Sequence, residues 1–144
     1  MLREYAESDI EDYMETWEAA SKLAHPFLSD EFHAQVGRDI RNTYLPVTES
    51  WVWESDGLVV GFVSLMGNEI GGLFVRPSCH RQGIGKSLVD HALAARGHLE
   101  VEVFKDNEIG RNFYAKRGFV PIAEKLHDDS GHFVVRLELV PSND

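Results

Sequence analysis

This chain is organised around one stretch of its sequence, residues 73–88, which reads LFVRPSCHRQGIGKSL. An apolar strand pattern ends at Arg76-Pro77, and a helical pattern begins at Gly83 after a glycine-rich turn. The first N–H groups of a helix have no intrahelical partners and lie at the positive end of the helix dipole. The turn is therefore a candidate anion site, where Gly83 and Gly85 would let the backbone approach a diphosphate closely. The alternative is a plain strand-to-helix turn whose glycines only permit tight packing.

Two other phosphate-binding motifs fail at this turn. The P-loop needs a glycine five residues before Gly85, where the sequence has His80. The dinucleotide-binding fingerprint needs a glycine at position 88, where the sequence has Leu88. Both motifs are therefore excluded, and a phosphate bound at this turn must belong to another kind of ligand.

The spacing of apolar residues predicts strands and helices in a mixed order. The predicted strands cover residues 2–5, 51–53, 58–66, 69–75, 99–104, a segment from 118, and 133–139. The predicted helices run from Ser8 through Ala20, from Ser29 or Asp30 to about residues 44–46, and over 83–96 and 107–116. Hairpins come first, then strand, helix, strand and helix, then a final hairpin. This order predicts a mixed sheet in an α/β or α+β fold.

Local signals define several features of these elements. Ser8, with Glu11 three residues later, is a capping-box pattern for the first helix. Asn107 is well placed as the N-cap of the last helix. The pair Gly71-Gly72 predicts a bulge or a close backbone approach within its strand. The last strand alternates, with one face predicted to carry Phe133, Val135, Leu137 and Leu139.

Two segments resemble motifs of the GNAT superfamily of N-acetyltransferases. Residues 73–88 resemble its coenzyme A motif, Gln/Arg-x-x-Gly-x-Gly/Ala directly after a strand. Residues 107–119, NEIGRNFYAKRGF, resemble its second motif, N-x-x-A-x-x-F-Y-x-x-x-G-F. The stretch His25-Pro26-Phe27-Leu28 is similar to the YjaB-like bacterial branch. Together with the matching order of elements, the resemblance covers nearly the whole chain.

The resemblance implies the GNAT fold, a central, mostly antiparallel twisted sheet of about seven strands flanked by about four helices. It implies one N-acetyltransferase domain over residues 1–144. The implied reaction is direct transfer of an acetyl group from acetyl-CoA to a primary amine of a small molecule, a peptide, or a protein lysine or N-terminus. A second hypothesis is a non-catalytic module that senses acyl-CoA, and a third is an acetyltransferase that acts on charged tRNA.

By the same resemblance, acetyl-CoA lies along one strand edge and the glycine-rich turn. The pantetheine arm is expected to pair with Leu73-Phe74-Val75 as an added strand, with a backbone oxyanion donor near Phe74 or Val75. Asn107 is expected to contact the arm or a bound water. The residues expected to bind acetyl-CoA are Leu73, Phe74, Val75, Arg81, Gln82, Gly83, Ile84, Gly85, Lys86, Asn107 and Tyr114.

The sequence departs from the family pattern at two positions. His80 stands where the family usually has Gln or Arg, and we expect modest harm because neighbouring backbone amides do most of the pyrophosphate binding. Gly110 replaces the usual Ala, at a cost in helix propensity of up to ~1 kcal/mol. We expect this glycine to make room for the cofactor.

Three side chains are candidates for proton transfer. A free lysine amine has a pKa of about 10.4, so only about one molecule in 2,500 is neutral at pH 7, and a general base matters. Glu69 and Glu102 match positions where GNAT enzymes carry a base, although either can be a surface carboxylate. Glu100 shares a strand face with Glu102, where like charges repel. By resemblance Tyr114 protonates the leaving thiolate, and its alternative role is packing beside Phe113.

Composition limits the partners and the compartment. The formal net charge of −10 argues against a nucleic-acid partner and suits a cationic amine. Cys79 is the only cysteine, which excludes an internal disulfide. No apolar run approaches the ~20 residues of a membrane helix, and the N-terminus lacks a signal-peptide pattern. Seven histidines form no short Cys/His cluster. We expect a cytoplasmic monomer or homodimer without a metal ion or a membrane contact.

Overall fold

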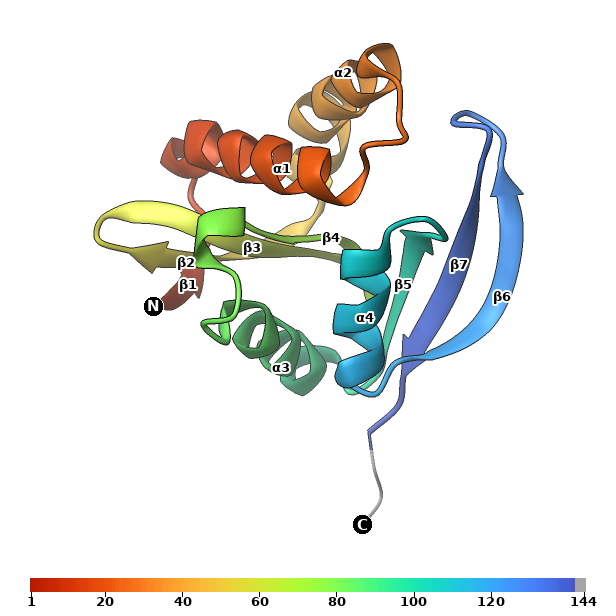
Figure 1. Ribbon diagram of the computed structural model, residues 1–144. Coiled ribbons are helices and arrows are strands. Elements are labelled where there is room, and N and C mark those ends of the chain that lie inside the picture. The colour runs from red at the N-terminus through yellow and green to blue at the C-terminus, as the bar shows by residue number, and fades with distance from the viewer. Residues whose placement is uncertain (142–144) are drawn as a thin grey trace.

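Residues 1–141, the part of the chain that the computed structural model describes, form one twisted sheet of seven strands (Figure 1). The strands are β1 (Leu2–Glu4), β2 (Glu49–Ser55), β3 (Leu58–Met66), β4 (Glu69–Val75), β5 (Leu99–Phe104), β6 (Val120–His127) and β7 (His132–Leu139). They lie in the order β1-β2-β3-β4-β5-β7-β6, and every neighbouring pair is antiparallel except β4 and β5. The predicted fold class, a mixed and mostly antiparallel sheet, is confirmed.

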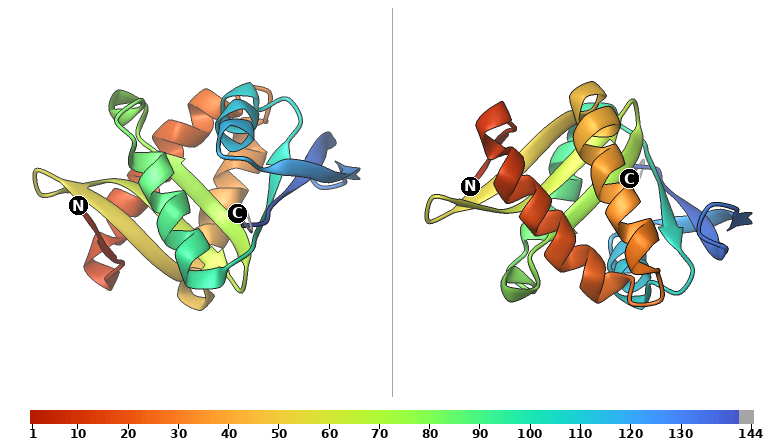
Figure 2. Two further views of the ribbon diagram at one scale, coloured as in Figure 1. Left: turned by 90° about the horizontal axis from the view of Figure 1, so that it is seen from below. Right: turned by 90° about the horizontal axis from the view of Figure 1, so that it is seen from above.

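Helices cover both faces of the sheet. Within residues 1–141 the four α-helices are α1 (Ile10–Ala24), α2 (Asp30–Asp39), α3 (Ile84–Arg96) and α4 (Glu108–Lys116). Figure 2 shows α3 lying across one face of the strands, seen from below, and α1 and α2 lying across the other face, seen from above. None of the helices in this described part is long and apolar enough to cross a membrane.

Each face of the sheet has its own core, because side chains along a strand alternate between the two faces. Leu88 of α3 and Tyr114 of α4 belong to one cluster, and Tyr13 and Trp17 of α1 belong to the other. Strand β4 serves both cores. Leu73 and Val75 pack against the α3 side, while Phe74 packs against the α1 side.

The helix caps agree with two of the three predicted signals. The hydroxyl oxygen of Ser29 accepts a hydrogen bond from the Phe32 N–H at 3.1 Å, so Ser29 is the N-cap of α2. Asn107 is the N-cap of α4, as predicted. The capping box predicted for Ser8 and Glu11 is wrong. A short 3₁₀ turn precedes α1 instead. The Asp9 carboxylate organises this turn by accepting a hydrogen bond from the Ala6 N–H.

A bulge in β4 opens the centre of the sheet. Gly72 is opposite Ser64, and Ile70 is opposite Leu65, so among the described strands Gly71 has no counterpart on β3. This confirms a bulge at the predicted glycine pair. Before the bulge, β4 pairs with β5 through Glu69 and Ile70, and beyond it the described strands share no further residue pair. Strands β4 and β5 therefore form a V that is closed at Ile70 and open toward Val75 and Phe104.

The final strand follows the predicted alternation over most of its length. Val135, Leu137 and Leu139 are buried against the α3 side of the sheet. Phe133 belongs to the same alternation but is 51% exposed. The reason is the length of the β6–β7 hairpin, whose tip extends beyond the helices (Figure 1). The Lys105 amine lies 5.9 Å from the centre of the Phe133 ring.

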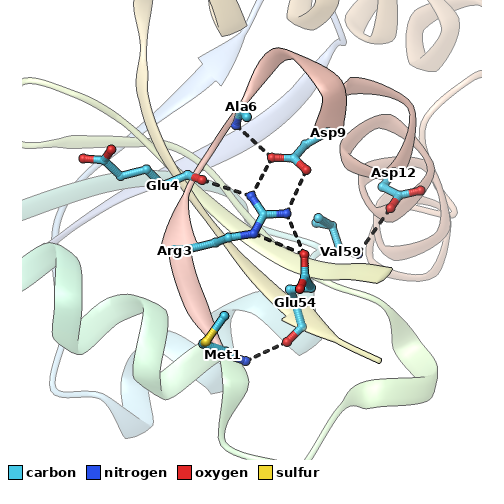
Figure 3. Close-up of polar contacts among 8 residues, drawn as sticks. All are labelled: Met1, Arg3, Glu4, Ala6, Asp9, Asp12, Glu54 and Val59. Atoms are coloured by element: carbon cyan, nitrogen blue, oxygen red, sulfur yellow. Dashed lines mark hydrogen bonds and ion pairs between the residues drawn. The ribbon is translucent and has the colours of Figure 1, made fainter. Parts of the chain in front are cut away.

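Arg3 ties the first strand to both α1 and the β2–β3 hairpin (Figure 3). Its guanidinium donates to the Asp9 carboxylate at 2.8 and 2.9 Å and to Glu54 at 2.8 and 3.2 Å. Asp9 also accepts a hydrogen bond from the Ala6 N–H at 2.8 Å. The pKa of Asp9 is lowered, first by the hydrogen bond with Arg3, so its stabilising contribution is lost as the pH falls through that pKa.

We expect Arg3→Ala to lower the free energy of unfolding by about 1–3 kcal/mol, because it leaves the buried Asp9 carboxylate without its cation. Denaturant unfolding measures the change. The matched control is Arg41→Ala, which removes an exposed ion pair with Glu11 and should leave stability nearly unchanged. Equal effects of the two variants would contradict the role given to Arg3.

Candidate active site

The open V presents the backbone of β4 to any molecule that enters it. The Arg76 N–H bonds the Val60 carbonyl at 2.8 Å, and hydrogen-bonded positions alternate along an antiparallel pair. The N–H and C=O groups of Phe74 therefore point to β3, while those of Leu73 and Val75 point into the V. Of the two positions expected to hold the oxyanion donor, Val75 has an available N–H and the Phe74 N–H is used within the sheet.

His80 lies against the same strand edge. Its Nε2–H donates a hydrogen bond to the Val75 carbonyl at 2.8 Å, which agrees with the outward direction of that carbonyl. The sequence motif had suggested a position beside the phosphates. The imidazole instead covers part of the β4 edge where the pantetheine arm was expected to pair.

The glycine-rich turn delivers free donors at the start of α3. Gly83 has φ +79° and Arg81 has φ +66°, so the turn uses the left-handed region twice. The first bond of the helix runs from the Ser87 N–H to the Gly83 carbonyl at 3.0 Å. The N–H groups of residues 84–86 precede that bond and have no partner within the helix. This turn therefore has the geometry of an anion site.

The two glycines of the motif, Gly83 and Gly85, are required for different structural reasons. Gly83 is needed for its positive φ, and an added Cβ there would meet no described atom within 4 Å. A Cβ at Gly85 would lie 2.9 Å from the Phe113 ring of α4. Gly85 therefore allows α3 and α4 to pack closely, which is the packing alternative considered for the motif. Arg81, Gln82 and Lys86 are exposed, and the Lys86 amine pairs with Asp90 at 3.4 Å.

Asn107 caps α4 and also contacts the loop that follows α1. Its Oδ1 accepts the Gly110 N–H at 2.8 Å, and its Nδ2 lies 3.2 Å from Nε2 of His25. A Cβ at Gly110 would lie 2.5 Å from that Nδ2. Gly110 therefore makes room for the Asn107 side chain, and the space expected for the cofactor stays a prediction. No local sequence signal links His25 to Asn107, because they are 82 positions apart.

The surroundings of His25 keep its imidazole neutral. Nδ1 lies 2.9 Å from the Ser21 hydroxyl, and aromatic rings of Phe27, Phe74 and Phe104 surround it. Burial lowers the pKa of His25 to about 4. Above that pH the side chain carries no charge.

Tyr114 lies on the α3 side of the sheet. Its ring is buried edge-on between Phe113 and Phe119, with centroid distances of 5.4 and 5.0 Å. Burial raises the pKa of the phenol above its usual range, so the hydroxyl keeps its proton at neutral and moderately alkaline pH. Burial is the only influence on the pKa of this hydroxyl within residues 1–141, with no hydrogen-bond partner among them. The residue combines packing with an available O–H donor.

The two base candidates meet on the opposite face, around an arginine that sequence reasoning missed. Arg136 of β7 lies 3.3 Å from both carboxylate oxygens of Glu69 and 2.8 Å from Glu100. Hydrogen bonds with these two carboxylates raise the pKa of Arg136 above its usual range. Glu102 lies 3.9 Å from Arg136 and 3.5 Å from the Lys125 amine. The expected repulsion between Glu100 and Glu102 is therefore offset by a shared cation.

A cavity of about 400 Å³ lies beside these charges and is lined by Glu102, Ala123, Lys125, Val134 and Arg136. The loop after α1 approaches the same side of the sheet. The Phe27 ring lies 5.7 Å from that of Phe104 and 4.9 Å from that of His132, between centroids. The structure thus brings the His25–Leu28 loop, the end of β5 and the β6–β7 hairpin together. Within the described chain, no group of three His, Cys, Asp or Glu side chains is arranged to hold a metal ion.

The site fits the parts of a coenzyme A molecule. The free N–H groups at the start of α3 suit a pyrophosphate, and the outward N–H groups of Leu73 and Val75 suit an extended amide chain. The phenol of Tyr114 is on the α3 side, and the carboxylates are on the other. A thioester between these layers would have a proton donor on one side and proton acceptors on the other.

Comparisons with known proteins agree with this geometry. A family model described as "Acetyltransferase (GNAT) domain" matches residues 46–121, which is more than half of the chain. Peptidyl-lysine N-acetyltransferase YiaC of Escherichia coli (strain K12) is 36% identical over 120 residues, covering 83% of this chain and 82% of YiaC. Peptidyl-lysine N-acetyltransferase YjaB of Salmonella typhimurium (strain LT2) is 31% identical over 140 residues, covering 96% of each chain.

The same relationship is seen in three dimensions. The solution structure of apo-form YjaB from Escherichia coli matches with a TM-score of 0.87 and 28% identity, covering 99% of this chain and 98% of that one. The chain therefore belongs to the GNAT family of N-acetyltransferases, in the YjaB-like branch, and transfers an acetyl group from acetyl-CoA to an amine.

Proposed function

We propose that this enzyme acetylates lysine side chains of peptides or proteins. The observation that carries the proposal is the V between β4 and β5, with a buried phenol on one face and, on the other, a cavity that Glu102 borders together with Lys125 and Arg136. The relatives YiaC and YjaB are named peptidyl-lysine N-acetyltransferases, which supports a lysine acceptor. The net charge of −10 also favours approach of a cationic side chain.

Acetyl-CoA supplies the activated acetyl group, and the residues proposed to hold it are those of the sequence motifs. Residues 84–86 would donate their backbone N–H groups to the pyrophosphate, with Arg81, Gln82 and Gly83 shaping the turn. Leu73 and Val75 would pair with the pantetheine arm, and the Val75 N–H would stabilise the developing oxyanion. His80 would leave the Val75 carbonyl to admit the arm. Phe74 would contribute through its side chain on the acceptor face.

Two protons must move during transfer. The Tyr114 hydroxyl would give its proton to the departing thiolate. Glu102 would take the proton of the attacking amine, because it borders the cavity. Its ion pairs with Lys125 and Arg136 are long, at 3.5 and 3.9 Å, and hold the carboxylate less tightly than short ones would. Glu69 is the weaker candidate, since both of its oxygens lie 3.3 Å from Arg136. Arg136 would hold the carboxylates in place.

The alternative of a non-catalytic acyl-CoA sensor is not favoured, because the relatives are named as enzymes. We also propose a single domain over residues 1–144, a cytoplasmic location, a monomer or homodimer, and no nucleic-acid or membrane partner. The single cysteine and the acidic composition support these assignments.

A coenzyme A release assay tests the acceptor class. The panel contains a peptide with one internal lysine and a blocked N-terminus, a peptide with a free N-terminal alanine and no lysine, and a polyamine. We expect the highest kcat/KM with the lysine peptide. Faster turnover of the alanine peptide or the polyamine would reject the lysine assignment, and coenzyme A binding without turnover of any acceptor would favour the sensor.

We expect Tyr114→Phe to lower kcat by about 10²–10⁴-fold with little change in the KM for acetyl-CoA, because the variant loses a proton donor and keeps the ring. Steady-state kinetics measures this. Tyr13→Phe is the matched control, since Tyr13 is also a buried tyrosine but bonds Ser64 in the other core. Unchanged turnover in Tyr114→Phe would reject the acid role.

The raised pKa of Tyr114 also predicts the alkaline behaviour of the wild type. Because burial favours the protonated phenol, kcat should not fall between about pH 8 and pH 10 through loss of this proton. A pH–rate profile of kcat at saturating substrates measures it. A fall in that interval that disappears in Tyr114→Phe would show that the phenol ionises earlier than its burial implies.

The two carboxylates are distinguished by exchange for amides. We expect Glu102→Gln to lower kcat for the lysine peptide by about 10²-fold or more near pH 7, and less at alkaline pH, where the lysine ammonium loses its proton without a base. Glu69→Gln should have the smaller effect. Profiles of kcat/KM against pH that match the wild type for Glu102→Gln would exclude it as the base.

A further inference from the structure

We propose that His25 is a positioning residue for the transfer reaction. By orienting the Asn107 amide, it couples the coenzyme A site to the His25–Leu28 loop, which lies on the carboxylate side of the sheet and is called the acceptor-side loop below. The inference rests on the proposed contact of Asn107 with coenzyme A. It concerns residues that the two sequence motifs do not join, since His25 lies in the loop after α1 and Asn107 caps α4.

The orientation of the Asn107 amide follows from its partners. The backbone N–H of Gly110 can only donate, so the Asn107 atom 2.8 Å away is the acceptor Oδ1. The other end of the amide is therefore the NH₂ group, which lies 3.2 Å from Nε2 of His25. One N–H of this group points to His25, and the second is available to another acceptor, such as a pantetheine carbonyl.

The same partners fix the tautomer of His25. An amide NH₂ group only donates, so Nε2 of His25 must be the unprotonated nitrogen. Nδ1 then carries the hydrogen and donates it to the Ser21 hydroxyl oxygen at 2.9 Å. The chain of bonds from Ser21 through His25 to Asn107 is satisfied only by this neutral form.

His25 also bridges the open end of the V. Its ring centroid lies 6.4 Å from that of Phe74 on β4 and 5.2 Å from that of Phe104 on β5, both edge-on. The Phe27 ring of the acceptor-side loop lies 5.9 Å away. His25 thus touches both strands that hold the V apart, and its bond to Asn107 ties the loop to the start of α4.

His25 is poorly suited to be the general base of the reaction. Its Nε2 lone pair already accepts the Asn107 amide, and its lowered pKa makes it a weak proton acceptor at neutral pH. Its contribution is therefore geometric. Gly110 is the third member of the arrangement, because a side chain there would displace the amide that His25 receives.

The first experiment measures the dissociation constant of coenzyme A by calorimetry for His25→Phe, Gly110→Ala and the double variant. We expect each single variant to weaken binding by about tenfold, the effect of one hydrogen bond, and the double variant to weaken it no further. Effects that multiply in the double variant, or unchanged binding in His25→Phe, would overturn the proposal.

The control is His98→Phe. His98 also bonds an asparagine side chain, Asn68, at 3.0 Å, but these residues precede β5 and β4 at the closed end of the V. Its coenzyme A affinity should equal that of the wild type, and an equal loss would indicate a general structural effect. Thermal unfolding of every variant identifies any that fail to fold, and His25→Gln, which keeps a polar side chain, should recover part of the affinity.

The second experiment measures the coupling between the His25–Leu28 loop and the coenzyme A site directly. The ¹⁵N chemical shifts of the His25 ring at pH 7 should be those of the Nδ1–H tautomer, and Gly110→Ala should change them. Hydrogen exchange of the backbone amides of His25, Phe27 and Leu28 should slow when coenzyme A is added to the wild type and should respond less in Gly110→Ala. An Nε2–H tautomer, or the same slowing in both proteins, would reject the coupling.

The two proposals fail in different ways. Wild-type protein that binds coenzyme A and shows the His25 coupling, yet acetylates no lysine peptide, would reject only the proposed function. Wild-type protein that acetylates the lysine peptide, with coenzyme A affinity unaffected by His25→Phe, would reject only the role of His25.

Discussion

The bulge at Gly71 is the constraint on which the site depends. An unbroken parallel pair would use the outward N–H and C=O groups of β4 within the sheet. Because one extra residue bends β4 away from β5, those groups at Leu73 and Val75 are left facing an opening. The cost is a line of backbone groups without strand partners in the middle of a sheet, of which His80 covers the Val75 carbonyl, and a bound chain with alternating amides can supply those bonds.

Charge is divided between the two sides of that opening. The α3 side offers uncharged donors, namely backbone N–H groups and a phenol whose pKa is raised by burial. The other side gathers three glutamates around Arg136, which keeps like charges close together without leaving them unpaired. An anionic cofactor and a cationic acceptor therefore meet environments of suitable and different polarity, separated by the thickness of one sheet.

Much of this arrangement was predictable from local sequence. The caps at Ser29 and Asn107 and the bulge at the glycine pair depend on residues within a few positions of each other, and the structure agrees with them. The capping box at Ser8 failed for a local reason, because the Asp9 carboxylate pairs with Arg3 and the Ala6 N–H in the turn before α1. The contacts that were missed join distant segments: Arg136 is 67 positions from Glu69, and His25 is 82 positions from Asn107. Such contacts follow from the packing of the whole sheet and have no local periodicity.

The contact between Gly85 and Phe113 has a consequence for how the family can diversify. A motif glycine is usually explained by the ligand it faces. Here the space that a side chain at Gly85 would fill is occupied by an aromatic ring from the next helix. Relatives that carry a larger residue at this position should carry a smaller one where Phe113 stands, so that the two positions change together. Substitutions that change how α3 packs against α4 would then move the glycine-rich turn at the start of α3. The affinity for the cofactor would therefore evolve together with this interior contact.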